Sequence, residues 1–375
     1  MDLEFTAEQE MLREMVRGLC ADASPLEQVR ALEDDALGYS SEFWAQLTEL
    51  DLIGLMLPTE YGGSGMNALE GAVLYEEFGR AVVPSPHFVS AVMSAGVIQR
   101  GGDDDQRSEW LPRIAKGDAI LTPAWLEPHG SFGPRGIRTT ATPAGDGYTI
   151  DGEKWHVPFA SAATRLVVLA RTGDAETDID LFLVDPAGEG VHLTQQMTLA
   201  SDTQYAVTLA SVHVSAADRI GPAGTGWPTW HETMLEGALL LAAQAIGGAR
   251  FALEITTQYA KDREQFGKPL GAFQSISHYL ADASTAVEGA TVLVHEAAWA
   301  CAEGRSIDRL APMAKLFACR TFRDTTAMAQ QVFGGVGFTL EYDIQLYFRR
   351  AKQLQISWWD DRALEDLIAA SVLDV

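Results

Sequence analysis

Arg263-Glu264-Gln265-Phe266-Gly267-Lys268-Pro269-Leu270, followed by Phe273-Gln274, is the stretch of sequence that decides the fold of this chain. It ends a long apolar segment of helical periodicity, Leu235 to Ala260, which we expect to be broken only at Gly247-Gly248. A second stretch, Gln331-Val332-Phe333-Gly334-Gly335-Val336-Gly337-Phe338, echoes it nearer the C-terminus. Helical patterning surrounds both stretches, so the C-terminal part of the chain is predicted to be helical.

The overall composition is that of a globular protein with a marked acidic surplus. The chain has 375 residues, of which 47% are hydrophobic, with 52 acidic and 27 basic residues and a net charge of −25. Such a surface repels nucleic acid and anionic membranes. An anionic cofactor would then need cations gathered locally, as they are in Lys261, Arg263 and Lys268.

The cysteines and the N-terminus bear on the cellular compartment. Cys20, Cys301 and Cys319 have no metal-ligand spacing, and we interpret them as buried thiols in a reducing compartment. The segment Met1 to Phe5 is acidic and lacks the basic region of a signal peptide. The longest apolar run, Ala238 to Ala249, is too short to span a bilayer. We therefore expect a cytoplasmic protein without membrane insertion.

The texture of the sequence changes twice and predicts three domains. Residues 1–120 show helical spacing, and residues 223–375 return to it. Between them, residues 121–222 hold short strand-like runs separated by turn signals, which is typical of a small β barrel or sandwich. The runs are Tyr148-Thr149-Ile150, Leu166 to Ala170, Leu181 to Val184 and Ala206 to Leu209. The predicted class is α+β.

General motif searches give nothing further. Gly334-Gly335-Val336-Gly337 lacks the spacing of a dinucleotide fingerprint, and no P-loop, metal-binding helix or nucleophile elbow is present in the sequence. We therefore predict no metal site.

The two quoted stretches resemble the flavin-binding signatures of the acyl-CoA dehydrogenase family. The loop Leu57 to Gly63, the segment Ile150 to Lys154 and the run Tyr347 to Lys352 extend the resemblance over essentially the whole chain. The resemblance implies a helical N-terminal domain, a middle β domain and a C-terminal four-helix bundle. It also implies an oxidoreductase that uses FAD, an acyl-CoA substrate and an electron-transfer flavoprotein as acceptor.

In this family two subunits share each FAD, and the resemblance implies that five residues of this chain bind the cofactor. Arg263 corresponds to the arginine that reaches the pyrophosphate of the neighbouring subunit's FAD, a task that suits the planar fork of a guanidinium. Phe266 and Gln274 are expected to line the adenosine arm. Gln331 and Gly335 are expected to meet the same arm from a loop where a side chain would collide with the ligand.

The half of the site that holds the flavin ring departs from the family pattern. The family has a threonine before Glu-Pro, where this chain has Leu126. The family has a tryptophan and a threonine two and four residues after the β-domain lysine, where this chain has His156 and Pro158. Pro158 lacks both the hydroxyl and a backbone donor.

The catalytic base is also missing at both of the family's positions. Nine residues beyond Arg349, most members carry a glutamate, and this chain has Trp358. Twenty-six residues before Arg263, a minority carry it, and this chain has Gly237. Glu236 is a poor substitute because one step along a helix turns the side chain by about 100°. Asp360 and Asp361 are further candidates, so the catalytic residue is left unassigned.

Three functions fit these observations. The favoured one is a subunit that lacks the base and completes the FAD site of a second acyl-CoA dehydrogenase subunit, as in bacterial heteromeric enzymes acting on steroid side chains or fatty acyl groups in β-oxidation. The second is a self-sufficient homotetramer with a relocated base. The third is a flavin enzyme of different chemistry, or a module that binds CoA thioesters without redox chemistry.

Overall fold

The structure is a computed structural model that describes residues 5–128 and 130–373. Residues 1–4, on which the expectation of no signal peptide largely rests, lie outside the described part. The α-helices are α1 (Ala7–Ala23), α2 (Leu26–Ala31), α3 (Ser41–Glu49), α4 (Ala68–Arg80), α5 (Ala95–Gly101), α6 (Asp104–Ala115), α7 (Gly226–Asp262), α8 (Gln274–Ala302), α9 (Leu310–Phe333), α10 (Ile344–Ile356) and α11 (Asp361–Leu373).

The strands lie where the sequence texture predicted them, with additions. They are β1 (Leu121–Ala124), β2 (Thr140–Ala144), β3 (Gly147–Pro158), β4 (Arg165–Arg171), β5 (Ile179–Val184), β6 (Val191–Gln196), β7 (Gln204–Ser215) and β8 (Arg219–Ile220), with β9 (Glu264–Gln265) and β10 (Lys268–Pro269) in a separate hairpin. The four predicted runs fall in β3, β4, β5 and β7. β1, β2 and β6 had not been identified as strands.

Several helices begin at N-capping residues that can be recognised in the local sequence. Thr6 accepts the backbone N–H of Gln9 at the start of α1, and the Gln9 side chain accepts the N–H of Thr6 in return. Asn67 with Glu70 at α4, and Asp103 with Gln106 at α6, form the same reciprocal box. Each box satisfies backbone donors that have no partner inside the helix.

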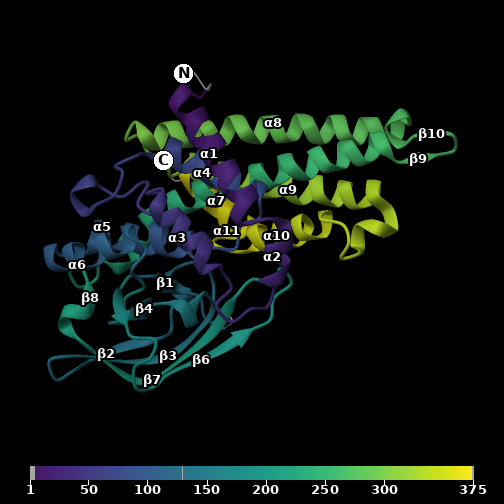
Figure 1. Ribbon diagram of the computed structural model, residues 1–375. Coiled ribbons are helices and arrows are strands. Elements are labelled where there is room, and N and C mark those ends of the chain that lie inside the picture. The colour runs from purple at the N-terminus through teal and green to yellow at the C-terminus, as the bar shows by residue number, and fades with distance from the viewer. Residues whose placement is uncertain (1–4, 129, 374–375) are drawn as a thin grey trace. The chain divides into compact units, whose positions relative to one another are not determined.

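The chain divides into two compact units that do not follow sequence order. One comprises Met1–Val29, Asn67–Val83 and Ala238–Val375, and the other comprises Arg30–Met66 and Pro84–Gly237. The first is helical, and its helices α7, α8 and α9 lie side by side, with the β9–β10 hairpin joining α7 to α8 at one end (Figure 1). The predicted domain boundaries near residues 120 and 222 remain a prediction.

Helix α7 is continuous, so the expected break at Gly247-Gly248 is wrong. A Cβ built on Gly247 would lie 1.9 Å from the carbonyl oxygen of Glu76 on α4, and one built on Gly248 would lie 2.5 Å from the ring of Phe322 on α9. These glycines therefore allow α4 and α9 to approach α7 closely, which offsets their low helix propensity.

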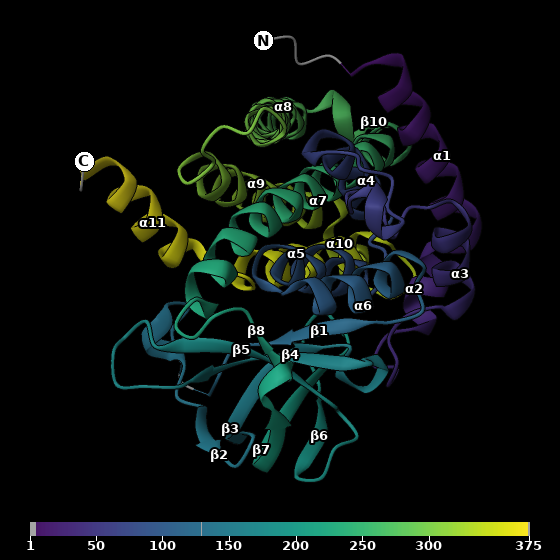
Figure 2. The same ribbon diagram turned by 90° about the vertical axis from the view of Figure 1, so that its left-hand side faces the viewer.

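The second unit is built on one sheet with the strand order β6-β7-β3-β2-β4-β5-β8, in which β1 also pairs with β4. The sheet curls so that β2, β3, β6 and β7 lie apart from β1, β4, β5 and β8 (Figure 2). Its inner side chains form one apolar core that includes Ile150 and Val207 from the first group and Val168 and Phe182 from the second. Burial of both groups of strands against this core stabilises the curl.

One helix of the described residues, α7, is long and apolar enough to cross a membrane by length and composition. However, 67% of its most apolar window is buried inside the protein, as in a core helix.

Candidate functional site

The first signature stretch forms a tight hairpin at the end of α7. Lys268 pairs with Gln265 and Pro269 with Glu264, which leaves Phe266 and Gly267 as a two-residue turn. Both turn residues have positive φ, 53° and 78°, as a type I′ turn requires. The turn projects from the protein, and the Phe266 side chain is 93% exposed.

The second signature stretch ends α9 beside this hairpin. The ring of Tyr259, one turn before Arg263 on α7, stacks on the ring of Phe333 with centroids 4.2 Å apart. Tyr342 packs edge-on against both rings. This aromatic cluster holds the end of α7 against the loop that contains Gly335. The tertiary structure thus places the second stretch against the end of the helix that leads into the first.

All five residues that the resemblance assigned to FAD are exposed: Arg263, Phe266, Gln274, Gln331 and Gly335. No side chain of the described residues pairs with the guanidinium of Arg263. Only the Arg263 backbone forms hydrogen bonds within the described part of the chain: its N–H donates to the carbonyl oxygen of Tyr259, and its carbonyl oxygen accepts from the N–H of Leu270. A Cβ on Gly335 would meet no atom within 4 Å, and its φ is not positive. The chain's own packing therefore does not require glycine there, which fits a ligand or a partner approaching this backbone.

At the first position of the family's base, Trp358 lies in an unusual turn between α10 and α11. Trp358 and Trp359 have φ of 53° and 74° and are 8% and 3% exposed. Consecutive left-handed conformations in bulky residues are strained and need support from their surroundings.

That support comes from Lys315, a fully buried residue of α9 that sequence reasoning missed. Its Nζ donates to the carbonyl oxygens of Leu354 (3.1 Å), Ser357 (3.0 Å) and Trp359 (2.8 Å), so all three ammonium protons have acceptors. Burial lowers the pKa of Lys315, opposed by Cys319 and the nearby aspartates. A lysine on the apolar side of a predicted helix was the only signal in the sequence.

At the second position, Gly237 leaves no free space for a carboxylate. A Cβ there would lie 2.5 Å from Sδ of Met93 and 3.3 Å from the ring of Phe88. The neighbouring Glu236 forms an ion pair with Arg100 of α5. Its carboxylate is therefore already engaged by a guanidinium.

The two C-terminal aspartates are engaged as well. Oδ1 of Asp360 accepts the backbone N–H of Ala363 at the start of α11. Oδ2 of Asp361 accepts from Nε of Arg320 at 2.9 Å and from Gln355 at 3.0 Å. Both carboxylates thus have structural partners.

The residues in place of the flavin-ring contacts lie around an irregularity in β3. Lys154 pairs with Val207 and Val157 with Tyr205, so β3 carries one extra residue at Trp155-His156. This is a β-bulge, and His156 takes a φ of 55° there. Counting residues from Lys154 therefore does not tell which face of the sheet each side chain occupies.

Polar groups at this bulge bond within the sheet unit. The backbone N–H of His156 donates to Gln196, and its ring Nδ1 lies 2.9 Å from Oε1 of Gln204. The hydroxyl of Thr122 donates to the carbonyl oxygen of Pro158 at 2.7 Å. These groups are already used by the chain's own fold.

Beneath the bulge, Lys154 forms a buried ion pair with Glu127. Its Nζ lies 2.6 Å from Oε1 of Glu127, which also accepts the backbone N–H of Thr139. Burial lowers the pKa of Lys154 to about 8 although Glu127 opposes the shift. The pair links the Glu127-Pro128 segment to β3 and so fixes the surroundings of Leu126.

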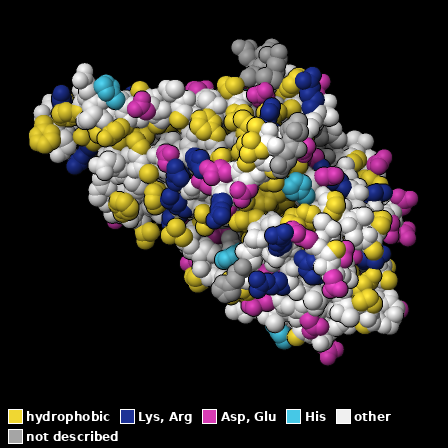
Figure 3. Space-filling view, turned by 180° about the vertical axis from the view of Figure 1, so that it is seen from behind, with side chains coloured by type: hydrophobic (Ala, Val, Ile, Leu, Met, Phe, Trp, Pro, Cys, Tyr) yellow, Lys and Arg dark blue, Asp and Glu magenta, His cyan; other side chains and the backbone are white. Residues whose placement is uncertain are grey.

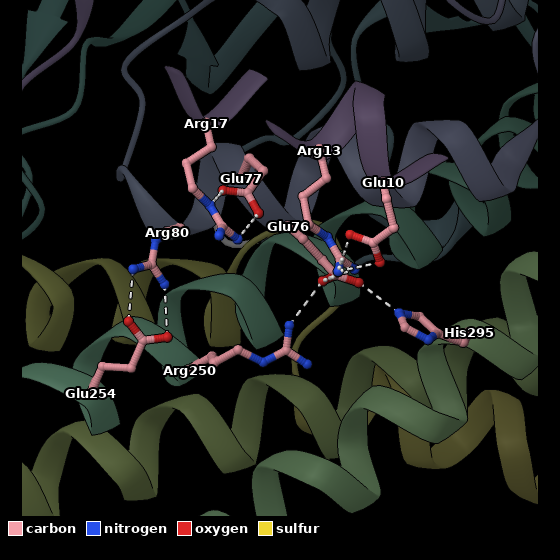
Figure 4. Close-up of polar contacts among 9 residues, drawn as sticks. All are labelled: Glu10, Arg13, Arg17, Glu76, Glu77, Arg80, Arg250, Glu254 and His295. Carbon is pink, nitrogen blue, oxygen red and sulfur yellow. Dashed lines mark hydrogen bonds and ion pairs between the residues drawn. The ribbon is translucent and has the colours of Figure 1, made fainter. Parts of the chain in front are cut away.

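A charged groove of about 710 Å³ lies elsewhere in the helical unit, and its guanidinium groups have carboxylate partners (Figure 4). The pairs are Arg13 with Glu10, Arg17 with Glu77, Arg80 with Glu254 and Arg250 with Glu76. Because each arginine is matched by a carboxylate, the groove offers an anionic ligand little unbalanced charge.

Glu76 is the centre of this network. It is 1% exposed, and it lies 2.6 Å from Nε2 of His295 and 3.1 Å from Nη1 of Arg250. Burial raises the pKa of Glu76, but the hydrogen bond from His295 and the charges of His295, Arg250 and Arg13 outweigh burial and leave it below its ordinary value. The network joins α1, α4, α7 and α8, and we assign it a structural role.

Comparisons with known proteins agree with this geometry. The N-terminal, middle and C-terminal domain models of acyl-CoA dehydrogenase match residues 6–118, 123–212 and 224–373. This chain belongs to the acyl-CoA dehydrogenase family. The predicted α+β fold and the FAD-dependent oxidoreductase class are thereby confirmed.

Individual relatives cover almost the full length. Probable acyl-CoA dehydrogenase YngJ of Bacillus subtilis is 32% identical over 366 residues, 95% of each chain. A variant of the steroid ACAD Tcur3481-Tcur3483 is 33% identical with a TM-score of 0.86, covering 97% of this chain and 98% of that one. The ChsE4-ChsE5 complex from Mycobacterium tuberculosis is 26% identical with a TM-score of 0.91 and full coverage of both chains.

Proposed function

We propose that this chain is a subunit of an FAD-dependent acyl-CoA dehydrogenase that lacks the catalytic base and completes the FAD site of a second subunit. One contrast carries the proposal. The guanidinium of Arg263 and the backbone of Gly335 are exposed and accessible to a ligand. By contrast, Trp358 and Gly237 occupy both positions at which family members carry the base.

The chemistry explains why this contrast matters. α,β-Dehydrogenation needs a carboxylate that takes a proton from the α-carbon of the thioester, and FAD supplies hydride acceptance when bound. Arg263 would hold the pyrophosphate, and the open backbone at Gly335 would let the adenosine arm approach. The base and the flavin-ring pocket would come from the second subunit.

The self-sufficient alternative finds little support in the carboxylates near the missing base. Glu236 pairs with Arg100, Asp361 with Arg320, and Asp360 caps α11. Releasing any one of them would require the loss of its present partner.

The kind of assembly is supported by solved relatives. One is the ChsE4-ChsE5 complex, which joins two different chains, and another is a steroid ACAD. We accordingly propose an acyl-CoA with a steroid side chain or fatty acyl group as substrate, an electron-transfer flavoprotein as acceptor, and a cytoplasmic location.

Expression with and without a partner tests the proposal. The chain alone should be purified without flavin and should not reduce an electron-acceptor dye with acyl-CoA. Co-expression with a second acyl-CoA dehydrogenase subunit that carries the glutamate should give a yellow, active complex. A yellow, active product from this chain alone would refute the proposal and favour the homotetramer.

Substitution of Arg263 tests the shared cofactor site within that complex. Arg263→Ala should lower the ratio of FAD to protein after gel filtration, because the pyrophosphate loses its guanidinium. Arg309→Ala, which removes another exposed arginine of the helical unit, is the matched control and should leave the ratio unchanged. Equal flavin content in both variants would refute the assignment.

A further inference from the structure

The turn that presents Phe266 is built from a residue that the turn itself disfavours. Type I′ turns prefer Asn, Asp or Gly because both central residues need positive φ. Here the first central residue is a phenylalanine at φ 53°, and its ring is 93% exposed. A strained backbone and an exposed aromatic ring are both unfavourable in the chain alone, so the ring is expected to find a partner when the protein functions.

Two neighbouring side chains lie close to this ring. The ring of Phe273, just before α8, stands at 82° to the ring of Phe266 with centroids 6.2 Å apart. On Phe273 itself, the ammonium of Lys268 lies 4.2 Å from the ring centroid. An edge-to-face pair and a cation over an aromatic face are both favourable contacts. Lys268, Phe273 and Phe266 thus form a chain of contacts across the hairpin.

We propose that Lys268 and Phe273 are positioning residues that hold the Phe266 ring ready to pack against the adenine end of FAD in the partner subunit. The inference rests on the proposed function. In Figure 3 the hairpin end, at the far left, shows hydrophobic and basic side chains beside each other. That combination suits a ligand with a flat aromatic base and adjoining phosphates, since the ring meets the base and Arg263 the phosphates.

The geometry favours an indirect role for Lys268. Its ammonium lies over Phe273, so it acts on Phe266 through that ring. Removing the charge should then loosen Phe266 without removing any atom that touches the ligand. This separates a positioning role from a direct contact with phosphate.

The test measures FAD affinity of the co-expressed complex, stripped of flavin and titrated with FAD. Phe273→Leu and Lys268→Met should each raise the Kd about threefold to tenfold, the range expected from losing one aromatic or cation–π contact. Lys268→Arg should restore the Kd to within about twofold, because a guanidinium also binds an aromatic face. Arg309→Met, which removes an exposed cation elsewhere in the helical unit, should have no effect.

A double variant identifies the route of the effect. If Lys268 acts through Phe273, adding Lys268→Met to Phe273→Leu should not raise the Kd further. Full additivity of the two changes would overturn the positioning role.

The outcomes also separate this inference from the proposed function. If Arg263→Ala and Phe266→Leu weaken FAD binding while Phe273→Leu and Lys268→Met do not, the inference fails and the shared site stands. If Arg263→Ala has no effect either, the proposed function fails. Phe266→Asn gives an independent readout: it should preserve or raise the melting temperature, because asparagine suits the turn, while it weakens FAD binding.

Discussion

The hairpin end of the helical unit and its interior differ in whether their charged residues and glycines have contacts within the chain. In the interior, Lys315 donates to three carbonyl oxygens and Glu76 accepts from His295 and Arg250. At the hairpin end, Arg263 has no side-chain partner among the described residues, and Gly335 faces open space. Residues with hydrogen-bond or ion-pair partners within the chain maintain the fold. The exposed residues without such partners are those we assign to the cofactor.

The two classes of glycine offer the strongest test of this comparison. Gly247→Ala should lower the free energy of unfolding by more than about 3 kcal/mol, because the new methyl group meets the backbone of α4, which cannot move aside. Gly335→Ala should change it by less than about 0.5 kcal/mol and instead reduce FAD retention in the complex. Urea denaturation of the isolated chain measures the free energy of unfolding of both variants. Equal destabilisation by the two substitutions would contradict the comparison.

Lys315 should show the next largest effect. Lys315→Met leaves three carbonyl oxygens near Trp358 without their donor. We expect the free energy of unfolding to fall by about 2–3 kcal/mol, a net value that includes relief of the cost of burying the ammonium. Lys261→Met is the control, since Lys261 is exposed. A denaturation midpoint equal to that of the control would show that Lys315 does not support the turn.

Glu76 should give a pH-dependent effect. Its pKa is lower in the folded than in the unfolded chain, so its contribution is full above the unfolded value, near 4.5, and is lost as the pH falls through the folded value. We expect Glu76→Gln to cost about 2 kcal/mol at pH 7 and progressively less below about pH 4.5. Thermal unfolding of both proteins at several pH values measures this, and a difference that does not vary with pH would contradict it.

Glu236 should show the smallest change. Its pair with Arg100 is partly exposed, so Glu236→Gln should alter the free energy of unfolding by less than about 0.5 kcal/mol. Turnover of the complex should be unchanged, since we assign the base to the partner. Loss of turnover with normal flavin content would instead identify Glu236 as the base.

The sequence motifs predicted which residues meet FAD, and the assignment of Arg263 and Gly335 stays a prediction. The β9–β10 hairpin was not predicted, because the phenylalanine at Phe266 is not a residue that a type I′ turn prefers. The bulge at Trp155-His156 was not predictable, because an extra residue in a strand becomes visible only against its pairing partner β7. Likewise, nothing local to Lys315 shows that it meets carbonyl groups about 40 residues away.

The sequence by itself determined the family and the order of helical and strand segments, and it motivates the proposal that Trp358 and Gly237 stand where relatives carry the base, because these depend on residue identity and spacing. Only the tertiary structure decided that α7 runs unbroken through Gly247, that the nearby carboxylates already have partners, and that Tyr259 at the end of α7 packs on Phe333 of the second signature stretch. The physical reason is that these outcomes depend on contacts between segments far apart in the chain, which local propensity does not encode.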